Sequence, residues 1–179
     1  MKSNKKRRVI KILVTGTRGI PGIQGGIETH CEELYPRLAE YGFHITLTRR
    51  IPYVNDHRDE YKGVQLKDFF APRSKGFEAI VHTIISTLYA RFHGFTCIHI
   101  HGIGPSLCGF FARLLGLKVV VTNHGPDYKR QKWGRISRFI LRLGELTGMM
   151  TAHRVIAVSR TIAERLCIMY QRKDGGSKS

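Results

Sequence analysis

The sequence lacks any long run of apolar residues. Hydrophobic residues make up 42% of its 179 residues, yet no stretch is long enough to span a bilayer. The apolar run from Val9 to Val14 follows a basic N-terminus, but it is shorter than the core of a secretory signal and leads into Gly16. We therefore interpret this run as a buried strand and expect a cytoplasmic globular protein.

Cysteine and acidic residues are both scarce. The cysteines are not spaced as metal ligands, so we expect reduced thiols, no metal and no cofactor. Asp and Glu number 13 against 30 Lys and Arg, which gives a formal net charge of +17. Such a surface attracts polyanions such as nucleic acid, anionic lipid or phosphorylated substrates. The basic residues concentrate in residues 1–8 and between Lys129 and Arg142.

Short apolar strands alternate with helical segments along the chain. The expected strands are 9–15, 44–48, 64–70, 97–101, 118–122 and 154–158, and the expected helices are 27–41, 77–92, 106–115, 135–149 and one from about 159. This alternation predicts an α/β fold, a Rossmann-like parallel sheet with helices on both faces. Pro36 should kink the first helix. We expect residues 9–170 to form the domain, after a basic extension (1–8) and before a disordered polar tail (171–179).

A glycine-rich loop from Gly16 to Gly26 joins the first expected strand to the first helix. Glycine lets the backbone approach a ligand, and a helix N-terminus offers free N–H groups and the positive end of the helix dipole. Parallel α/β folds also bind ligands at the carboxyl ends of their strands. These facts favour a phosphate-facing role for Gly25 and Gly26 over a simple turn, although the glycine spacing is not the dinucleotide fingerprint.

Two other classes of function are compatible with the sequence. An NADP-binding oxidoreductase would hold its nucleotide with this loop and Arg49, but it needs a proton-transfer pair that we do not find. A non-enzymatic nucleic-acid-binding protein is suggested by charge alone. Tyr128 and Trp133 would offer only a thin stacking platform, and no binding module is recognisable, so we expect no nucleic-acid partner.

Several motifs occur in the order found in one enzyme family. They are Thr17–Pro21 (TRGIP), Gly25–Thr29 (GGIET), His99–Gly102 (HIHG), Asn123–Asp127 (NHGPD), Lys129–Gly134 (KRQKWG) and Ile156–Ser159 (IAVS). Together they resemble the N-terminal domain of the family 4 type of retaining glycosyltransferases, in particular the branch of rhamnosyl- and other cell-surface polysaccharide transferases. The resemblance covers roughly residues 11–166 and implies one half of a GT-B fold, which has two Rossmann domains.

This resemblance implies an enzyme that moves a sugar from a nucleotide-sugar donor to a lipid-linked or glycan acceptor, in cell-surface polysaccharide synthesis. In the family, the first glycine-rich loop faces the donor diphosphate, and Gly25 and Gly26 match it. The histidine beside the transferring sugar is matched by His124, the expected catalytic residue. The family's donor-binding domain would begin after the last helix. The chain stops at Ser179, so we expect that domain to be absent and the chain alone to be inactive.

Other polar residues are expected on the acceptor side of the same edge. His101, Asp127 and Arg130 are the candidates, although His101 could equally be a hydrogen-bonded loop histidine. His99 alternates with apolar neighbours, so we expect it to point into the sheet in a structural role.

The helix expected from about Arg135 to Met149 is basic and amphipathic. Arg135, Arg138 and Arg142 share one face that could lie on an anionic membrane, although solvation explains these charges equally well. A membrane role would make the protein peripheral on the inner face. The apolar residues of the helix are expected to pack on the sheet: Ile136, Phe139, Ile140 and Leu143.

Overall fold

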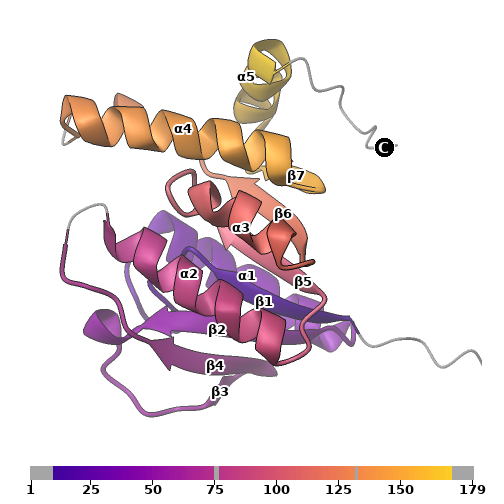
Figure 1. Ribbon diagram of the computed structural model, residues 1–179. Helices are drawn as coiled ribbons and strands as arrows, with labels where there is room; N and C mark the ends of the chain where they lie inside the picture. Colours follow the sequence, from indigo (N-terminus) through magenta and orange to yellow (C-terminus); the bar gives the residue numbers. More distant parts are fainter. Residues whose placement is uncertain (1–9, 75–76, 132, 171–179) are drawn as a thin grey trace, which may run out of the picture.

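A seven-stranded sheet forms the middle layer of the molecule (Figure 1). The computed structural model describes residues 10–74, 77–131 and 133–170. The strand order is β3-β4-β2-β1-β5-β6-β7, and every neighbouring pair is parallel except β3 with β4. The strands are β1 (Lys11–Thr15), β2 (His44–Arg50), β3 (Glu60–Tyr61), β4 (Val64–Phe69), β5 (Cys97–His101), β6 (Lys118–Asn123) and β7 (Arg154–Ala157).

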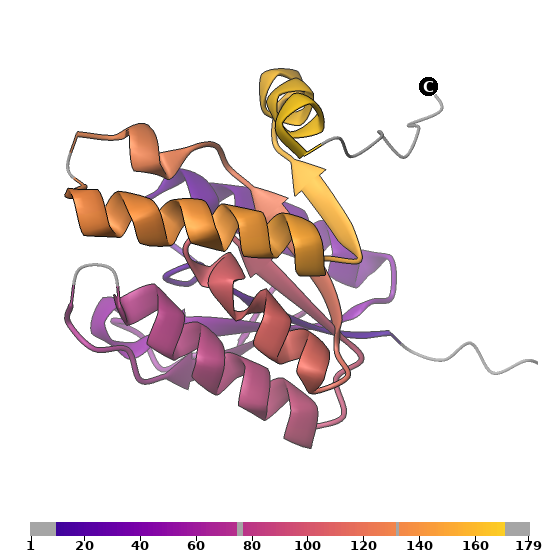
Figure 2. The same cartoon turned by 45° about the horizontal axis from the view of Figure 1, so that its top comes forward.

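Helices cover both faces of this sheet. One face carries α1 (Gly26–Glu40), and the other carries α2 (Phe77–Phe92), α3 (Gly109–Leu114) and α4 (Arg135–Thr151), which Figure 2 shows side by side. The last helix, α5 (Arg160–Tyr170), lies beyond the β7 edge (Figure 1). Three short 3-10 helices lie in connections: η1 (Ile51–Tyr53), η2 (Pro105–Cys108) and η3 (Asp127–Lys129).

Two apolar cores follow from the alternation of side chains along the strands. Leu13, Ile98 and Ile100 point to the α2–α4 face, where they pack with Ala90 of α2 and Ala112 of α3. On the opposite face, the strand residues Val14, Ile45, Leu47 and Leu66 pack with α1 residues including Cys31 and Tyr35. Because they are buried on both faces, β1 and β6 carry near-continuous apolar runs, as parallel strands in three-layer folds do, whereas β5 also carries the buried His99 and His101.

The predicted fold class is confirmed, and the expected strands and helices are present within a few residues. The two-residue strand β3 was not expected, and the helix expected at 106–115 is divided into η2 and α3. The first helix continues through the buried Pro36 to Glu40. The N-terminal extension and the C-terminal tail lie outside the described residues.

The described residues contain neither a disulfide nor a helix that could cross a membrane. The four cysteines form no disulfide with one another; Cys31 and Cys108 are buried, whereas Cys97 and Cys167 are half-buried. Burial raises the pKa of the Cys108 thiol to about 11, so it is protonated at neutral pH. No helix in the described part of the chain has the length and hydropathy needed to cross a bilayer.

Candidate active site

The carboxyl ends of β1, β5 and β6 meet at one edge of the sheet. Gly16, directly after β1, has a φ of +93° and lies against the backbone of His101 at the end of β5. A Cβ atom at Gly16 would overlap the carbonyl oxygen of His101. Glycine at this position therefore lets the two strand ends approach closely, and it places the following loop beside the end of β5.

The glycine pair stands at the N-terminus of α1, as expected. Gly25 is the N-cap residue, has a φ of +153°, and leaves the first turn without a side-chain cap. Beneath it, Oε1 of the buried Glu28 accepts hydrogen bonds from Thr17 Oγ1 (3.2 Å) and the backbone N–H of Arg18 (3.0 Å). Gly26 is exposed, and a Cβ atom there would have no other atom within 4 Å. The open side of this helix N-terminus is thus at Gly26.

His124 follows β6 directly and is half-buried at this edge. Its Nε2 lies 3.0 Å from Nδ1 of His101, and its ring centroid lies 5.3 Å from that of His30 in the first turns of α1. Burial, together with the nearby His30, lowers the pKa of His124 to about 4. The imidazole is therefore neutral at pH 7. The structure thus brings His124, His101 and the start of α1 together.

His30 was not singled out from the sequence. It lies four residues after Gly26, about one helical turn. Residues at this spacing share one face of a helix, so the sequence could have indicated that His30 lies on the same face as Gly26. Burial lowers the pKa of His30, and its Nε2 atom is buried without a hydrogen-bond partner among the described residues. Despite this grouping of histidines, no set of three His, Cys, Asp or Glu side chains in the described residues is arranged to hold a metal ion.

His101 and His99 lie beneath His124 rather than on the surface. His101 is completely buried, and His99 is 6% exposed. His99 is hydrogen-bonded to Tyr35 Oη (2.9 Å) and Thr122 Oγ1 (2.7 Å), which agrees with the structural role expected for it. Because no part of the His101 side chain reaches solvent, its expected place on the acceptor side must be corrected: it can affect a ligand only through His124.

Asp127 begins η3 and Arg130 directly follows it, a few residues beyond His124. Arg130 Nε and Asp127 Oδ1 form an ion pair at 3.1 Å, with the arginine largely exposed. The negative charge of Asp127 opposes the lowering of the His124 pKa, so the carboxylate lies within electrostatic reach of the imidazole. Both residues are therefore available to a ligand at this edge.

A buried carboxylate anchors the loop that carries His124. Glu145 of α4 is 2% exposed and accepts hydrogen bonds from Asn123 Nδ2 (2.9 Å) and Tyr128 Oη (3.1 Å). It also pairs with Arg165 of α5. Burial would raise the pKa of Glu145, but the hydrogen bonds from Arg165 and Asn123 lower it, so the carboxylate is ionised. Sequence patterns did not indicate this network because its members come from four separate elements, β6, η3, α4 and α5.

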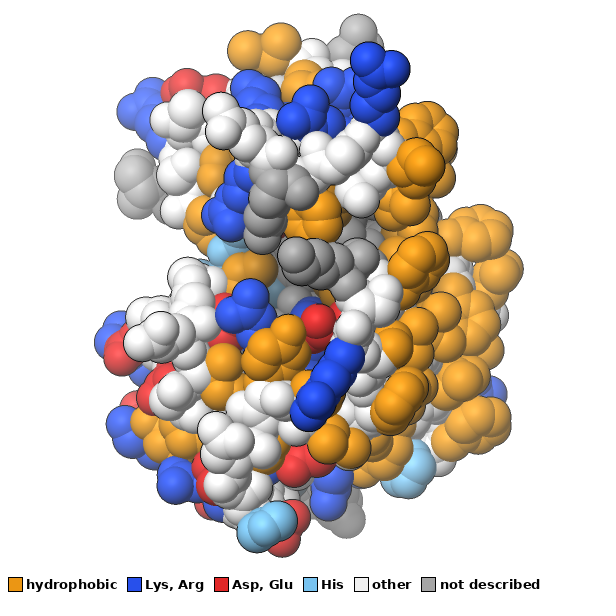
Figure 3. Space-filling model, turned by 90° about the vertical axis from the view of Figure 1, so that its left-hand side faces the viewer, with side chains coloured by type: hydrophobic (Ala, Val, Ile, Leu, Met, Phe, Trp, Pro, Cys, Tyr) orange, Lys and Arg blue, Asp and Glu red, His pale blue; other side chains and the backbone are white. Residues whose placement is uncertain are grey.

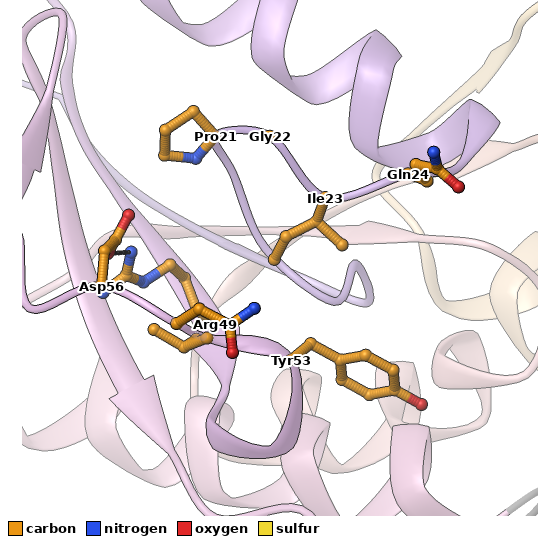
Figure 4. A pocket seen from close by; sticks show the side chains of 9 residues that line it. Pro21, Gly22, Ile23, Gln24, Arg49, Tyr53 and Asp56 are labelled. Atoms are coloured by element: carbon orange, nitrogen blue, oxygen red, sulfur yellow. Dashed lines mark hydrogen bonds and ion pairs between the residues drawn. The ribbon is translucent and has the colours of Figure 1, made fainter.

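A pocket of about 340 Å³ borders the glycine-rich loop (Figure 4). Its walls are Pro21 to Gln24 on one side and Arg49 with Tyr53 to Asp56 on the other. Arg49 is only 2% exposed, and its guanidinium donates to Asp68 (2.6 Å), Asp56 (2.6 Å) and the carbonyl of Arg58 (3.1 Å). These bonds occupy the guanidinium, so it has no free edge for the 2′-phosphate that an NADP site would require.

Three of the four α4 side chains expected to pack on the sheet are exposed instead, which corrects the expectation for Ile136, Phe139 and Leu143, whereas Ile140 is half-buried. Ile136 is 78% exposed and Phe139 67%, and they continue an apolar stripe through Leu143, Leu146 and Met150. The helix instead packs through glycine: a Cβ atom at Gly148 would lie 2.8 Å from Cβ of Ser106. This stripe adds to the apolar side chains gathered along the right-hand side of Figure 3, which is the face of α2, α3 and α4.

Arg135, Arg138 and Arg142 of α4 are exposed beside this stripe, as the expected shared face requires. The Arg142 guanidinium lies over the Tyr128 ring, 5.3 Å from its centroid, whereas Arg135 and Arg138 carry no ion pair among the described residues. The helix therefore presents apolar and cationic side chains to solvent together.

Comparisons with solved structures and with protein families identify the fold and the family of this chain. The structure is similar to sucrose-phosphate synthase from Thermosynechococcus elongatus, with a TM-score of 0.68 at 19% identity, over 90% of this chain and 45% of that one. A second structure of that enzyme gives a TM-score of 0.59 at 17% identity, over 94% of this chain and 85% of the other. At these identities the likeness shows the fold, which is one half of a GT-B fold.

No curated protein sequence matches the chain. This chain spans less than half the length of the first sucrose-phosphate synthase structure. Residues 24–174 match the family model described as Glycosyltransferase Family 4. The matched residues include the N-terminus of α1, His124 and the Glu145 network. The match covers most of the sequence and favours neither an oxidoreductase nor a nucleic-acid-binding protein, so the chain belongs to glycosyltransferase family 4.

Proposed function

We propose that residues 9–170 are the N-terminal, acceptor-binding domain of an enzyme that moves a sugar from a nucleotide-sugar donor to a lipid-linked or glycan acceptor. Membership of glycosyltransferase family 4 supports sugar transfer, and the motif resemblance supports a role in cell-surface polysaccharide synthesis. The single observation that carries the proposal is the meeting of an uncapped helix N-terminus at Gly25 and Gly26 with His124 at one edge.

In this proposal Gly25 and Gly26 bind the donor diphosphate. The first turn of α1 has no side-chain cap, so its backbone N–H groups can donate to phosphate oxygens. The absence of a side chain at Gly26 leaves room for that approach. As the sugar leaves, negative charge accumulates on the diphosphate, and fixed N–H donors with a helix dipole stabilise such charge without reorganising.

His124 is proposed to lie beside the transferring sugar. Its pKa of about 4 makes it neutral at pH 7, so it acts through hydrogen bonding rather than as a fixed positive charge. Asp127 and Arg130 are proposed to contact the acceptor from the adjacent loop. His101 is proposed to act from beneath, through its contact with His124.

Transfer also requires a second Rossmann-like domain, which we propose supplies the main contacts to the nucleotide and sugar. The described residues contain a single such sheet, and we propose that it provides one wall of a cleft. Donor and acceptor must be held together and shielded from water for efficient transfer. We therefore propose that this domain alone is inactive.

We further propose that the domain works against the inner face of an anionic membrane, with α4 toward the lipid. The specific observation is the exposed stripe from Ile136 to Met150 beside Arg135 and Arg138, in a chain with a net charge of +17. Apolar side chains can enter the headgroup boundary while arginines pair with anionic lipids. Such a position would bring the site edge close to a lipid-linked acceptor.

Titration of the ¹⁵N-labelled chain with pyrophosphate and a panel of nucleotide sugars tests the diphosphate site. Backbone amide signals of Gly25, Gly26 and the following turn should shift, together with that of His124. Gly26→Val should abolish these shifts while leaving the rest of the spectrum unchanged, because a Cβ atom at this position has no other atom within 4 Å. Shifts confined to other regions, or unaffected by Gly26→Val, would exclude the proposed donor site.

A further inference from the structure

Five side chains form an unbroken line of hydrogen bonds that ends at His124. Thr122 Oγ1 lies 2.7 Å from His99 Nε2, and His99 Nδ1 lies 2.9 Å from Tyr35 Oη. The Tyr35 hydroxyl also bonds to His101 Nε2, and His101 Nδ1 lies 3.0 Å from His124 Nε2. We call this set of residues the histidine chain. It joins β6, α1 and β5 to the loop that follows β6.

The inner members of the histidine chain are uncharged. Thr122, Tyr35 and His101 are completely buried, and His99 is 6% exposed. Burial lowers the pKa of His99 to about 3 and holds that of His101 well below its ordinary value. It also raises the pKa of Tyr35 well above 10.0, so the phenol keeps its hydrogen. Each neutral imidazole therefore carries one N–H and one accepting nitrogen.

Counting hydrogens leaves only two arrangements for the chain. Tyr35 has one hydroxyl hydrogen and two imidazole partners, so it donates to one and accepts from the other. If it donates to His101, then His101 must donate from Nδ1 to Nε2 of His124. His124 then carries its own hydrogen on Nδ1. If Tyr35 donates to His99 instead, every bond reverses and His124 carries its hydrogen on Nε2.

Thr122 distinguishes the two arrangements. When Tyr35 donates to His101, His99 donates to Tyr35 and its Nε2 accepts the Thr122 hydroxyl hydrogen, so every buried donor is satisfied. In the reverse arrangement His99 donates to Thr122, whose own hydroxyl hydrogen then has no other acceptor among the described residues. A buried donor without a partner costs about 1–3 kcal/mol. The first arrangement is therefore favoured.

We propose that Tyr35 and His101 are positioning residues that hold His124 as its Nδ1–H tautomer, so that His124 presents a hydrogen-bond donor to the site. Nδ1 of His124 is not among the buried nitrogens, and it makes no hydrogen bond to a described residue. The ring nitrogen that accepts is already occupied by His101. His124 thus donates to an oxygen of the sugar or the diphosphate and does not act as a general base. This inference rests on the proposed placement of His124 beside the sugar.

Nitrogen NMR of the ligand-free, ¹⁵N-labelled chain tests the inference, because long-range ¹H–¹⁵N spectra distinguish protonated from unprotonated ring nitrogens. Imidazole free in water favours the Nε2–H form, so the expected Nδ1–H form of His124 at pH 7 is diagnostic. Tyr35→Phe should convert His124 to a mixture in which Nε2–H predominates. Tyr61→Phe removes another hydroxyl near α1, bonded to Glu32 at 3.2 Å, and should leave His124 unchanged.

If Tyr35→Phe fails to fold, Thr122→Val provides a second test, because valine has nearly the shape of threonine. It removes the hydroxyl that sets the direction of the chain, and both tautomers of His124 should then appear. A wild-type His124 mainly in the Nε2–H form would overturn the inference, as would a folded Tyr35→Phe protein with an unchanged tautomer. The measurement uses no donor or acceptor, so its failure is distinguishable from failure of the nucleotide-sugar titration.

Discussion

The carboxylate of Glu28 occupies the space into which a side chain at Gly25 would project. Gly25 therefore has a packing role, with a φ of +153°, whereas its neighbour Gly26 adjoins open space. The two glycines match the same family motif, but the structure predicts that a substitution at Gly25 lowers stability, whereas one at Gly26 does not.

Gly25→Ala should destabilise the fold. The new methyl group would overlap Glu28 and force an unfavourable φ, a combination that typically costs about 1–3 kcal/mol. Urea denaturation followed by circular dichroism measures the loss. Gly26→Ala is the matched control and should change the free energy of unfolding by less than about 1 kcal/mol. Equal effects of the two substitutions would contradict this division of roles.

Glu145→Gln should be strongly destabilising. It removes the charge that pairs with Arg165 and disturbs the acceptor of the Asn123 and Tyr128 hydrogen bonds. Breaking one partner of a buried ion pair costs about 3–5 kcal/mol. Glu164→Gln, which removes an exposed pair with Arg160 in α5, should cost less than about 1 kcal/mol. Thermal unfolding measures the stability of both variants. Similar losses of stability would contradict the anchoring role of Glu145.

The free energy of unfolding should fall as the pH is lowered from 6.5. His82, His99 and His101 are buried, and burial lowers their pKa values, to about 3 for His82 and His99. The unfolded chain binds protons at these histidines below pH 6.5, whereas the folded protein does not until the pH approaches the lowered pKa values. Each buried histidine thus contributes up to about 1.4 kcal/mol per pH unit in this window.

Urea titrations at pH 7, 6 and 5 measure this slope. His82→Gln should reduce it, because glutamine does not titrate, even if the variant is less stable at pH 7. A free energy of unfolding that is constant from pH 7 to pH 5 would show that these histidines are accessible to protons in the folded protein.

Binding to anionic vesicles should depend on α4. Arg135→Gln with Arg138→Gln should weaken binding by roughly 30-fold, since each basic residue near the surface contributes about 1 kcal/mol. Phe139→Ser should also weaken binding by removing an exposed apolar side chain. Arg37→Gln with Arg160→Gln makes the same change in charge on other helices and should have less effect. Cosedimentation at low and high salt measures these effects, and equal binding to neutral vesicles would refute the electrostatic part.

The 179-residue chain should show no measurable sugar transfer by itself. It provides one wall of the proposed cleft, and loss of even one charge-stabilising donor typically lowers a rate by about 100- to 1000-fold. Incubation with labelled nucleotide sugars and a membrane lipid extract measures turnover. Robust transfer would contradict the single-wall proposal and favour a dimer in which two copies complete the site.

The sequence by itself determined the order of strands and helices, the glycine-rich loop and the family. Apolar periodicity is a local property, so it identified the buried strands and α1 without knowledge of the partners. The loop and the motif around His124 could also be placed, because strand ends in a parallel sheet share one edge. Together these features predicted that His124 would lie at the same edge as the start of α1, but they did not indicate His30.

Only the tertiary structure decided how polar side chains are paired and which helix faces are covered. Tyr35 meets His101 across 66 residues of sequence, and Arg49 is occupied by Asp68 from a neighbouring strand, neither of which a local pattern can indicate. In α4, close packing through Gly144 and Gly148 turned the apolar stripe outward. Periodicity shows that a helix has an apolar face, but the shape of the neighbouring surface selects the face that is buried.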